Sequence, residues 1–221
     1  ATSRIGRRLT LALSYLHDYQ RSEISNEALL DFESRDELIS LGLDPTTGVQ
    51  EGTLAELIGS IEYNATVNPL DPSSGYLMSL SLERAGGLLP GTFHFYAVSA
   101  EARHYLPLGP YLTWANRARI ATTDPDGPRS DVPFAKRYFL GGSTSLRGWG
   151  RFEVAPLSGF GLPIGGFSAL ELSTEARVGT WRNIGLVFFL DAGNVWPGSW
   201  EFGLGDLVYD AGPGLRYQTP V

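Results

Sequence analysis

Arg147 is the side chain of this sequence whose surroundings most clearly indicate a binding role. It lies in the glycine-rich stretch Arg137–Gly150, with the sequence RYFLGGSTSLRGWG. A guanidinium is always charged and offers a planar fork of donors, so it pairs best with carboxylates. Glu175 and Asp191 have the same strand parity, and their separation of 16 residues (191 minus 175) fits a hairpin that places them side by side. We therefore expect Arg147 to bridge Glu175 and Asp191.

For these three side chains to meet, the loop that carries Arg147 has to fold back over the strands that carry the carboxylates. Removing one partner of such a partly buried ion pair costs about 3–5 kcal/mol, and less where water reaches it. Asp191 has an alternative role at this stage, which is to cap a turn with Gly193 and Asn194 at the end of a strand.

Other chemistry is weakly supported by the residue pattern. The segment Asp124–Asp131 lacks the spacing of an EF-hand and is typical of turns. The three histidines, at positions 17, 94 and 104, have no metal-ligand spacing, and no Ser-His-Asp set stands in a hydrolase context. The sequence therefore predicts a protein that is not an enzyme and has no cofactor or metal site.

The composition bounds the class of protein. The 221 residues are 43% hydrophobic and 12% aromatic, contain no cysteine and carry a net charge of −7. Disorder and a disulfide scaffold are excluded, and the acidic balance disfavours nucleic acid as a partner. Lys136 is the only lysine of the chain. No apolar run approaches the roughly 20 residues of a membrane helix, so any membrane crossing has to use strands.

Alternating hydrophobicity predicts eight long strands, each bounded by Gly, Pro, Asn or Asp. In one of them Met78, Leu80 and Leu82 oppose Ser79, Ser81 and Glu83. Lengths of 10 to 14 residues match tilted membrane strands better than strands of soluble sheets, which have roughly five or six residues. The fold class expected is all-β, an antiparallel transmembrane β-barrel. The expected strands are Arg7–Gln20, Thr53–Val67, Gly75–Ala85, Thr92–Leu106, Tyr111–Thr122, Gly166–Gly179, Asn183–Trp196 and Leu207–Thr219.

A soluble barrel or sandwich gives the same alternation with its apolar face inward, so periodicity alone does not decide the orientation. The polar faces here carry paired charges, such as Glu101 with Arg103 and Glu175 with Arg177, and the apolar faces carry almost none in mid-strand. This favours apolar side chains on lipid and charges in an aqueous lumen. Glu171, Arg117, Arg119 and Arg216 are then expected to be solvated wall residues.

The connections between the expected strands alternate in length. Arg21–Gly52 and Ala121–Gly165 are long, whereas Asn68–Ser74 and Pro107–Pro110 are short turns, as in outer-membrane barrels. The first long loop also has capping-box spacing at Ser34 and Glu37, which predicts a helical turn that ends at Gly42.

The stretch Arg137–Gly150 resembles the sixth-loop motif of the BamA/TamA-type outer-membrane assembly factor family, the D15-like barrels, whose loop folds back into the barrel lumen. Three further stretches are similar to family motifs: Tyr63–Gly75, Phe189–Trp196 and Gly212–Val221. Ala65, Thr66 and Val67 depart from the acidic and basic residues that the family has in the first of them. The resemblance assigns a functional loop motif to Gly141, Gly142, Leu146, Arg147, Gly148 and Trp149, and Glu175 and Asp191 match the family's acidic partners of the arginine.

The resemblance implies that residues 1–221 are part of a C-terminal membrane β-barrel domain. They would correspond to strands 7 to 14 of a sixteen-stranded barrel, with POTRA domains and the last strands absent. The implied function is to help β-barrel or autotransporter substrates fold into the bacterial outer membrane. The implied partners are the outer-membrane lipid bilayer and unfolded substrate proteins, and periplasmic or inner-membrane accessory proteins stay open.

Two rival functions also remain open at the sequence level. One is a two-partner-secretion pore of the same superfamily, which exports a polypeptide through its lumen. The other is a self-contained eight-stranded barrel, for which Arg7–Gln20 would have to pair with Leu207–Thr219.

Overall fold

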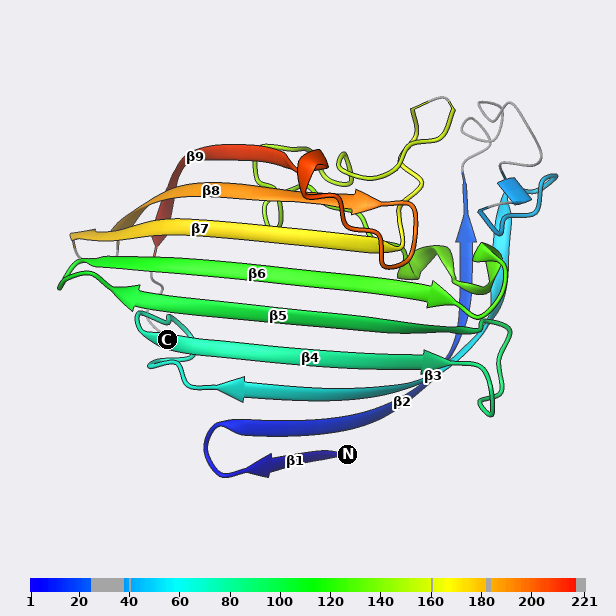
Figure 1. Ribbon diagram of the computed structural model, residues 1–221, viewed down its shortest axis with the longest axis horizontal. Coiled ribbons are helices and arrows are strands. Elements are labelled where there is room, and N and C mark those ends of the chain that lie inside the picture. Colours follow the sequence, from blue (N-terminus) through cyan, green and yellow to red (C-terminus); the bar gives the residue numbers. More distant parts are fainter. Residues whose placement is uncertain (25–37, 40, 160, 182–183, 218–221) are drawn as a thin grey trace.

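The computed structural model is a single antiparallel β-sheet whose nine strands lie in sequence order (Figure 1). It describes residues 1–24, 38–39, 41–159, 161–181 and 184–217. Each inner strand pairs with the strands before and after it in the chain. The strands are β1 (Thr2–Ile5), β2 (Leu9–Glu23), β3 (Val49–Asn64), β4 (Gly75–Ala85), β5 (Phe95–Pro107), β6 (Leu112–Pro125), β7 (Ser168–Trp181), β8 (Ile184–Trp196) and β9 (Val208–Tyr217).

The sheet is curved, and its connections differ at its two ends (Figure 1). Short turns join β5 to β6 and β7 to β8, whereas a long loop, Asp126–Phe167, joins β6 to β7. This loop contains two short 3-10 turns, η1 (Arg129–Asp131) and η2 (Phe134–Lys136), and a third turn, η3 (Leu204–Asp206), precedes β9. The connections from β5 to β8 thus alternate as expected, whereas the connection from β4 to β5, Gly86–His94, is short although it lies in the series of long loops.

The described residues form nine strands where the sequence pattern predicted eight. The extra strand, β1, has four residues and pairs with β2 from Thr2 opposite Ala12 to Ile5 opposite Leu9. Four residues are too few for an alternating pattern to stand out, so the pairing partner rather than the local sequence identifies this strand.

The two faces of the sheet differ as the alternation predicted. Along β4 the side chains alternate between half-buried and exposed, with Met78, Leu80 and Leu82 exposed. Leu186 and Phe188 of β8 are also exposed, Phe188 by 57% of its surface. Contiguous apolar surface of this extent is unstable in water and is typical of a surface that faces lipid. A soluble barrel with an apolar interior is therefore excluded.

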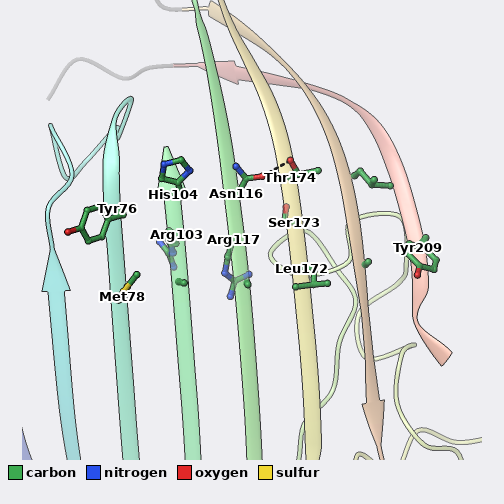
Figure 2. A pocket seen from close by; sticks show the side chains of 14 residues that line it. Tyr76, Met78, Arg103, His104, Asn116, Arg117, Leu172, Ser173, Thr174 and Tyr209 are labelled. Atoms are coloured by element: carbon green, nitrogen blue, oxygen red, sulfur yellow. Dashed lines mark hydrogen bonds between the residues drawn. The ribbon is translucent and has the colours of Figure 1, made fainter. Parts of the chain in front are cut away.

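The outer face includes a shallow hollow of about 710 Å³ that spans β4 to β9 (Figure 2). Small side chains form its floor, among them Ala102 and Ala118, which lie opposite each other on β5 and β6. Thr174 Oγ1 donates to Asn116 Oδ1 at 2.8 Å, and Trp114 Nε1 donates to Thr174 Oγ1 at 2.7 Å. These polar groups satisfy one another on an otherwise apolar face, as a low-dielectric surrounding requires.

The core of the described residues lies between the concave face of the sheet and the loops. One buried cluster joins Val132 and Phe167 of the long loop to Leu54 of β3 and Phe95 of β5. A second cluster joins Leu140, Leu146 and Val154 of the long loop to β7 and β8.

A third buried cluster, Leu38, Leu41 and Leu43, lies in the region of the helical turn expected after Ser34. Ser34 and Glu37 lie outside the described residues. Gly42 has a φ of +77° and donates its N–H to the carbonyl of Ile39 at 2.9 Å, as a helix-terminating glycine does.

The strand pairing of β2 rules out the self-contained eight-stranded barrel, in which β2 would pair with β9. Both edges of β2 are occupied, one by β1 and the other by β3, and β9 pairs with β8.

Within the described ranges, no helix combines the length and the apolar character needed to cross a bilayer.

Candidate functional site

The long loop lies over the concave face and reaches several strands. Its path is fixed by three isolated bridges: Tyr138 with Gly166, Leu140 with Val154, and Leu157 with Pro163. The second bridge closes a neck, with Leu140 N donating to Val154 O at 2.9 Å and Val154 N donating to Leu140 O at 3.2 Å. We call Gly141–Glu153, beyond this neck, the tip, and Arg129–Tyr138 the base.

Arg147, in the tip, contacts both carboxylates that the sequence analysis named. Its Nε and Nη2 donate to the two oxygens of Asp191, each at 2.7 Å, and its Nη1 lies 2.5 Å from Glu175 Oε1. Asp191 is fully buried in mid-β8, which rules out the alternative in which it caps a turn at a strand end. The hydrogen bonds to Asp191 raise the pKa of Arg147 above its ordinary value. The result is a bidentate fork on Asp191 with a third contact to Glu175.

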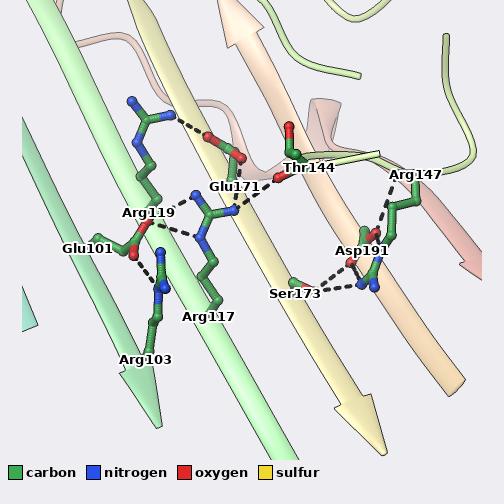
Figure 3. A network of polar contacts seen from close by, with 9 residues as sticks. All are labelled: Glu101, Arg103, Arg117, Arg119, Thr144, Arg147, Glu171, Ser173 and Asp191. Atoms are coloured by element: carbon green, nitrogen blue, oxygen red, sulfur yellow. Dashed lines mark hydrogen bonds and ion pairs between the residues drawn. The ribbon is translucent and has the colours of Figure 1, made fainter. Parts of the chain in front are cut away.

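Two partners of Arg147 were missed by the sequence analysis. Ser173 Oγ accepts from Arg147 Nη2 at 3.1 Å and donates to Asp191 Oδ1 at 2.6 Å (Figure 3). The guanidinium carbon also lies 3.7 Å from the ring centroid of Phe189, a cation–π contact. Both residues have the strand parity of Glu175 and Asp191, which is the signal that could have identified them.

The other residues of the loop motif hold the tip in shape. Leu146 is 1% exposed and packs with Leu140 and Val154, and Trp149 packs partly against the same cluster. Gly141 has a φ of +105°, and a Cβ there would collide with the carbonyl oxygen of Gly150.

Gly142 and Gly148 add backbone contacts to the tip. Gly142 donates its N–H to the carbonyl of Trp149 at 2.9 Å. A Cβ at Gly148 would come 2.7 Å from the Cβ of Asp210, which lies opposite Asp191 on β9. Gly148 thus lets the loop approach β9 closely.

An ion network lies beside Arg147 on the same face and corrects one expectation. Glu171 is buried and pairs with Arg119 at 2.6 Å and with Arg117 at 3.3 Å, and Arg117 pairs with Glu101 at 2.9 Å (Figure 3). Arg117 also donates to the carbonyl of Thr144 in the tip at 3.5 Å. Glu171 is therefore not a solvated wall residue, whereas the side chains of Arg117 and Arg119 stay partly exposed, by 27% and 34%. Arg216 does remain half-exposed, paired with Asp71 at 2.9 Å.

In the part of the chain that the structure describes, no three His, Asp or Glu side chains are grouped so as to hold a metal ion. The concave face offers permanent cations held on carboxylates, with hydrogen bonds to the loop backbone. Such a site fixes the position of a segment of chain.

A curved antiparallel sheet with an apolar outer face and a charged concave face that holds a loop defines part of an outer-membrane-type β-barrel. The model of the Omp85 superfamily domain matches residues 1–221. The chain therefore belongs to the Omp85 superfamily, which confirms the resemblance drawn from its motifs. As a member of this superfamily it lies in the bacterial outer membrane.

The chain is similar in sequence to one named protein and in fold to one solved structure. The chain is 27% identical over 165 residues to the outer membrane protein assembly factor BamA of Neisseria meningitidis serogroup B, an alignment that covers 70% of this chain and 20% of that protein. Its fold is similar to the crystal structure of BamA from Haemophilus ducreyi lacking POTRA domains 1–3. That match has a TM-score of 0.73 at 22% identity and covers 96% of this chain and 45% of the other. The chain thus spans about a fifth of its curated relative.

Proposed function

We propose that this chain is part of the membrane domain of an outer-membrane protein assembly factor, whose long loop is held inside the barrel by Arg147. The observation that carries the proposal is the three-point attachment of Arg147 to Asp191 and Glu175, on a loop that covers the concave face. The name of the Neisseria relative, an assembly factor, supports it.

The proposed role is noncovalent. A substrate strand gains main-chain hydrogen bonds by adding to an open edge of a barrel, and a locally thinned bilayer lowers the cost of inserting it. In this scheme Arg147 keeps the loop in one place on the concave face, so that the lumen has a defined shape while a substrate assembles nearby.

We further propose that residues 1–221 form part of a larger C-terminal barrel domain, alongside further strands and POTRA domains. The two edges of the described sheet support this, because β1 pairs only with β2 and β9 only with β8 among the described residues. Unpaired strand edges are not stable in the hydrocarbon region, so further strands are needed to close the barrel. The proposed partners are the lipid bilayer and unfolded β-barrel or autotransporter substrates.

The test is an assembly assay with the full-length protein in phospholipid vesicles. An unfolded outer-membrane β-barrel protein is added, and its folding is followed by the gel mobility of unheated samples. Arg147→Ala is expected to slow folding about tenfold, a factor that corresponds to 1.4 kcal/mol. Arg151→Ala is the matched control, since Arg151 is an exposed arginine of the same tip that stacks on Phe152.

Equal folding rates with Arg147→Ala and with the parent protein would contradict the role of the loop. A parent protein that leaves the substrate unfolded, but conducts ions and exports a polypeptide, would instead establish the two-partner-secretion pore.

A further inference from the structure

Lys136, the only lysine of the chain, lies at the base of the long loop between two carboxylates of the sheet. Its Nζ is 2.9 Å from Oε1 and 2.8 Å from Oε2 of Glu56 on β3, and 2.9 Å from Oε2 of Glu83 on β4. The Glu56 side chain is 1% exposed. A carboxylate this deeply buried needs a cation, and among the described contacts Lys136 supplies it.

Further contacts hold the base against the same strands. Gln50 of β3 accepts a hydrogen bond from Phe134 N at 2.7 Å, and its Nε2 donates to the carbonyl of Val132 at 3.3 Å. Val132 is fully buried in the cluster that includes Leu54 of β3. The base is therefore attached by charge, by hydrogen bonds and by apolar packing.

The cations of base and tip share no partner, although Tyr138 at the end of the base packs against the cluster that contains Leu146. Val132 belongs to one buried cluster and Leu146 to another, and the partners of Lys136 lie on β3 and β4 whereas those of Arg147 lie on β7 and β8. Between them the chain passes through the narrow neck at Leu140 and Val154. This arrangement allows either part to detach while the other stays in place.

We propose that Lys136 is a positioning residue that holds the base of the long loop on β3 and β4, independently of Arg147, so that the loop is clamped at two points across the concave face. In consequence, loss of Arg147 releases the tip beyond the neck and leaves the base in place. The inference goes beyond the proposed function, because it concerns where the loop is held and its test reads loop position rather than substrate assembly.

The charge on Lys136 gives the base a pH dependence that the tip lacks. Burial acts to lower the pKa of Lys136, but hydrogen bonds to Glu56 and Glu83 and their charges outweigh it, so the pKa is raised. A raised pKa means that the attachment is complete below about pH 10.4, the ordinary lysine value, and is lost as the pH rises further. Arg147 keeps its charge throughout this range.

The experiment places nitroxide spin labels in the full-length protein, in a background without other cysteines, and reads their mobility in vesicles. Ala135→Cys reports on the base and Ser143→Cys on the tip, since both residues are exposed and tolerate a label. Lys136→Met is expected to raise the mobility of the Ala135 label severalfold and to leave the Ser143 label unchanged. Arg147→Ala is expected to give the opposite pattern. Arg129→Ala, which removes an exposed cation of the same base, is the matched control.

Rescue by a conservative variant separates the charge from simple packing. Lys136→Arg is expected to keep the Ala135 label immobile at neutral pH and also at alkaline pH values at which the parent protein releases its base. Arg137, whose pKa is lowered to about 10 by burial, belongs to the same base and is present in both proteins, so a difference between them belongs to position 136.

Two results would overturn the proposal. One is an Ala135 label that stays immobile in Lys136→Met, and the other is a variant that mobilises both labels together. If Lys136→Met fails to fold because Glu56 is left without a cation, the double variant Lys136→Met with Glu56→Met removes the buried charge as well. Its Ala135 label should then be more mobile than that of the parent, and an immobile label would count equally against Lys136.

Discussion

The tip and the base of the long loop are held on different parts of one sheet by two different cations. At the tip, the planar guanidinium of Arg147 forms a fork with Asp191 and lies over the ring of Phe189. At the base, the ammonium of Lys136 lies as a point charge between Glu56 and Glu83. The tip attachment thus depends on geometry, whereas the base attachment depends on charge.

Because the two attachments differ, a given substitution is expected to release either the tip or the base of the loop. A fork is lost when its donors are displaced by a small distance, whereas a point charge between two carboxylates tolerates such shifts. Four variants test the two attachments, and those expected to lose most docking free energy come first. Each is measured by a denaturant titration that follows a nitroxide at Ser143 for the tip and at Ala135 for the base.

Leu146→Ala should reduce the free energy with which the tip docks on the sheet by about 2–5 kcal/mol, because truncation of a fully buried leucine leaves a cavity. The base should stay attached, since Leu146 and Val132 lie in separate clusters. Leu157→Ala, which truncates an exposed leucine of the same loop, should change neither label. Equal loosening of base and tip would show that the loop docks as one unit.

Arg147→Lys should reduce the docking free energy of the tip by about 2 kcal/mol, since a lysine cannot form at least one of the charged hydrogen bonds of the fork. The reverse exchange at the base, Lys136→Arg, should change the docking free energy by less than about 1 kcal/mol, because the positive charge remains between the carboxylates. If both cost the same, fork geometry is not what distinguishes the tip.

Arg84→Ala should have the smallest effect, about 0–1 kcal/mol, although it removes a bidentate ion pair with Asp126 at the start of the long loop. The Arg84 and Asp126 side chains are 43% and 32% exposed, so solvent screens much of the attraction between their charges. A loss of several kcal/mol with movement of the base would show that this surface pair is a third attachment.

The alternation of the sequence was enough to predict most of the fold. Period-two patterns and turn residues located β2 to β9, and the charged face of β5 and β7 indicated which side faces water. It could not locate β1, which is too short for a periodic signal and is defined by pairing with β2. The parity of Glu175 and Asp191, together with the position of Arg147 in a glycine-rich loop, was also enough to bring these three residues together as candidates.

The base attachment could not be found in the same way. Lys136 is separated by 80 positions from Glu56 and by 53 from Glu83. No local motif links such distant residues. The burial of Glu171 was missed for the same reason, since the loop that covers it comes from another part of the chain.

Period, turn chemistry and guanidinium geometry are local properties, so the strands, the face of each side chain and the cation at the tip can be predicted from the residues alone. How far the loop reaches over the sheet, and which carboxylates it covers, depends on packing between distant segments. A carboxylate on a strand is solvated or buried according to what packs over it, and here that cover is supplied by residues far away in the chain.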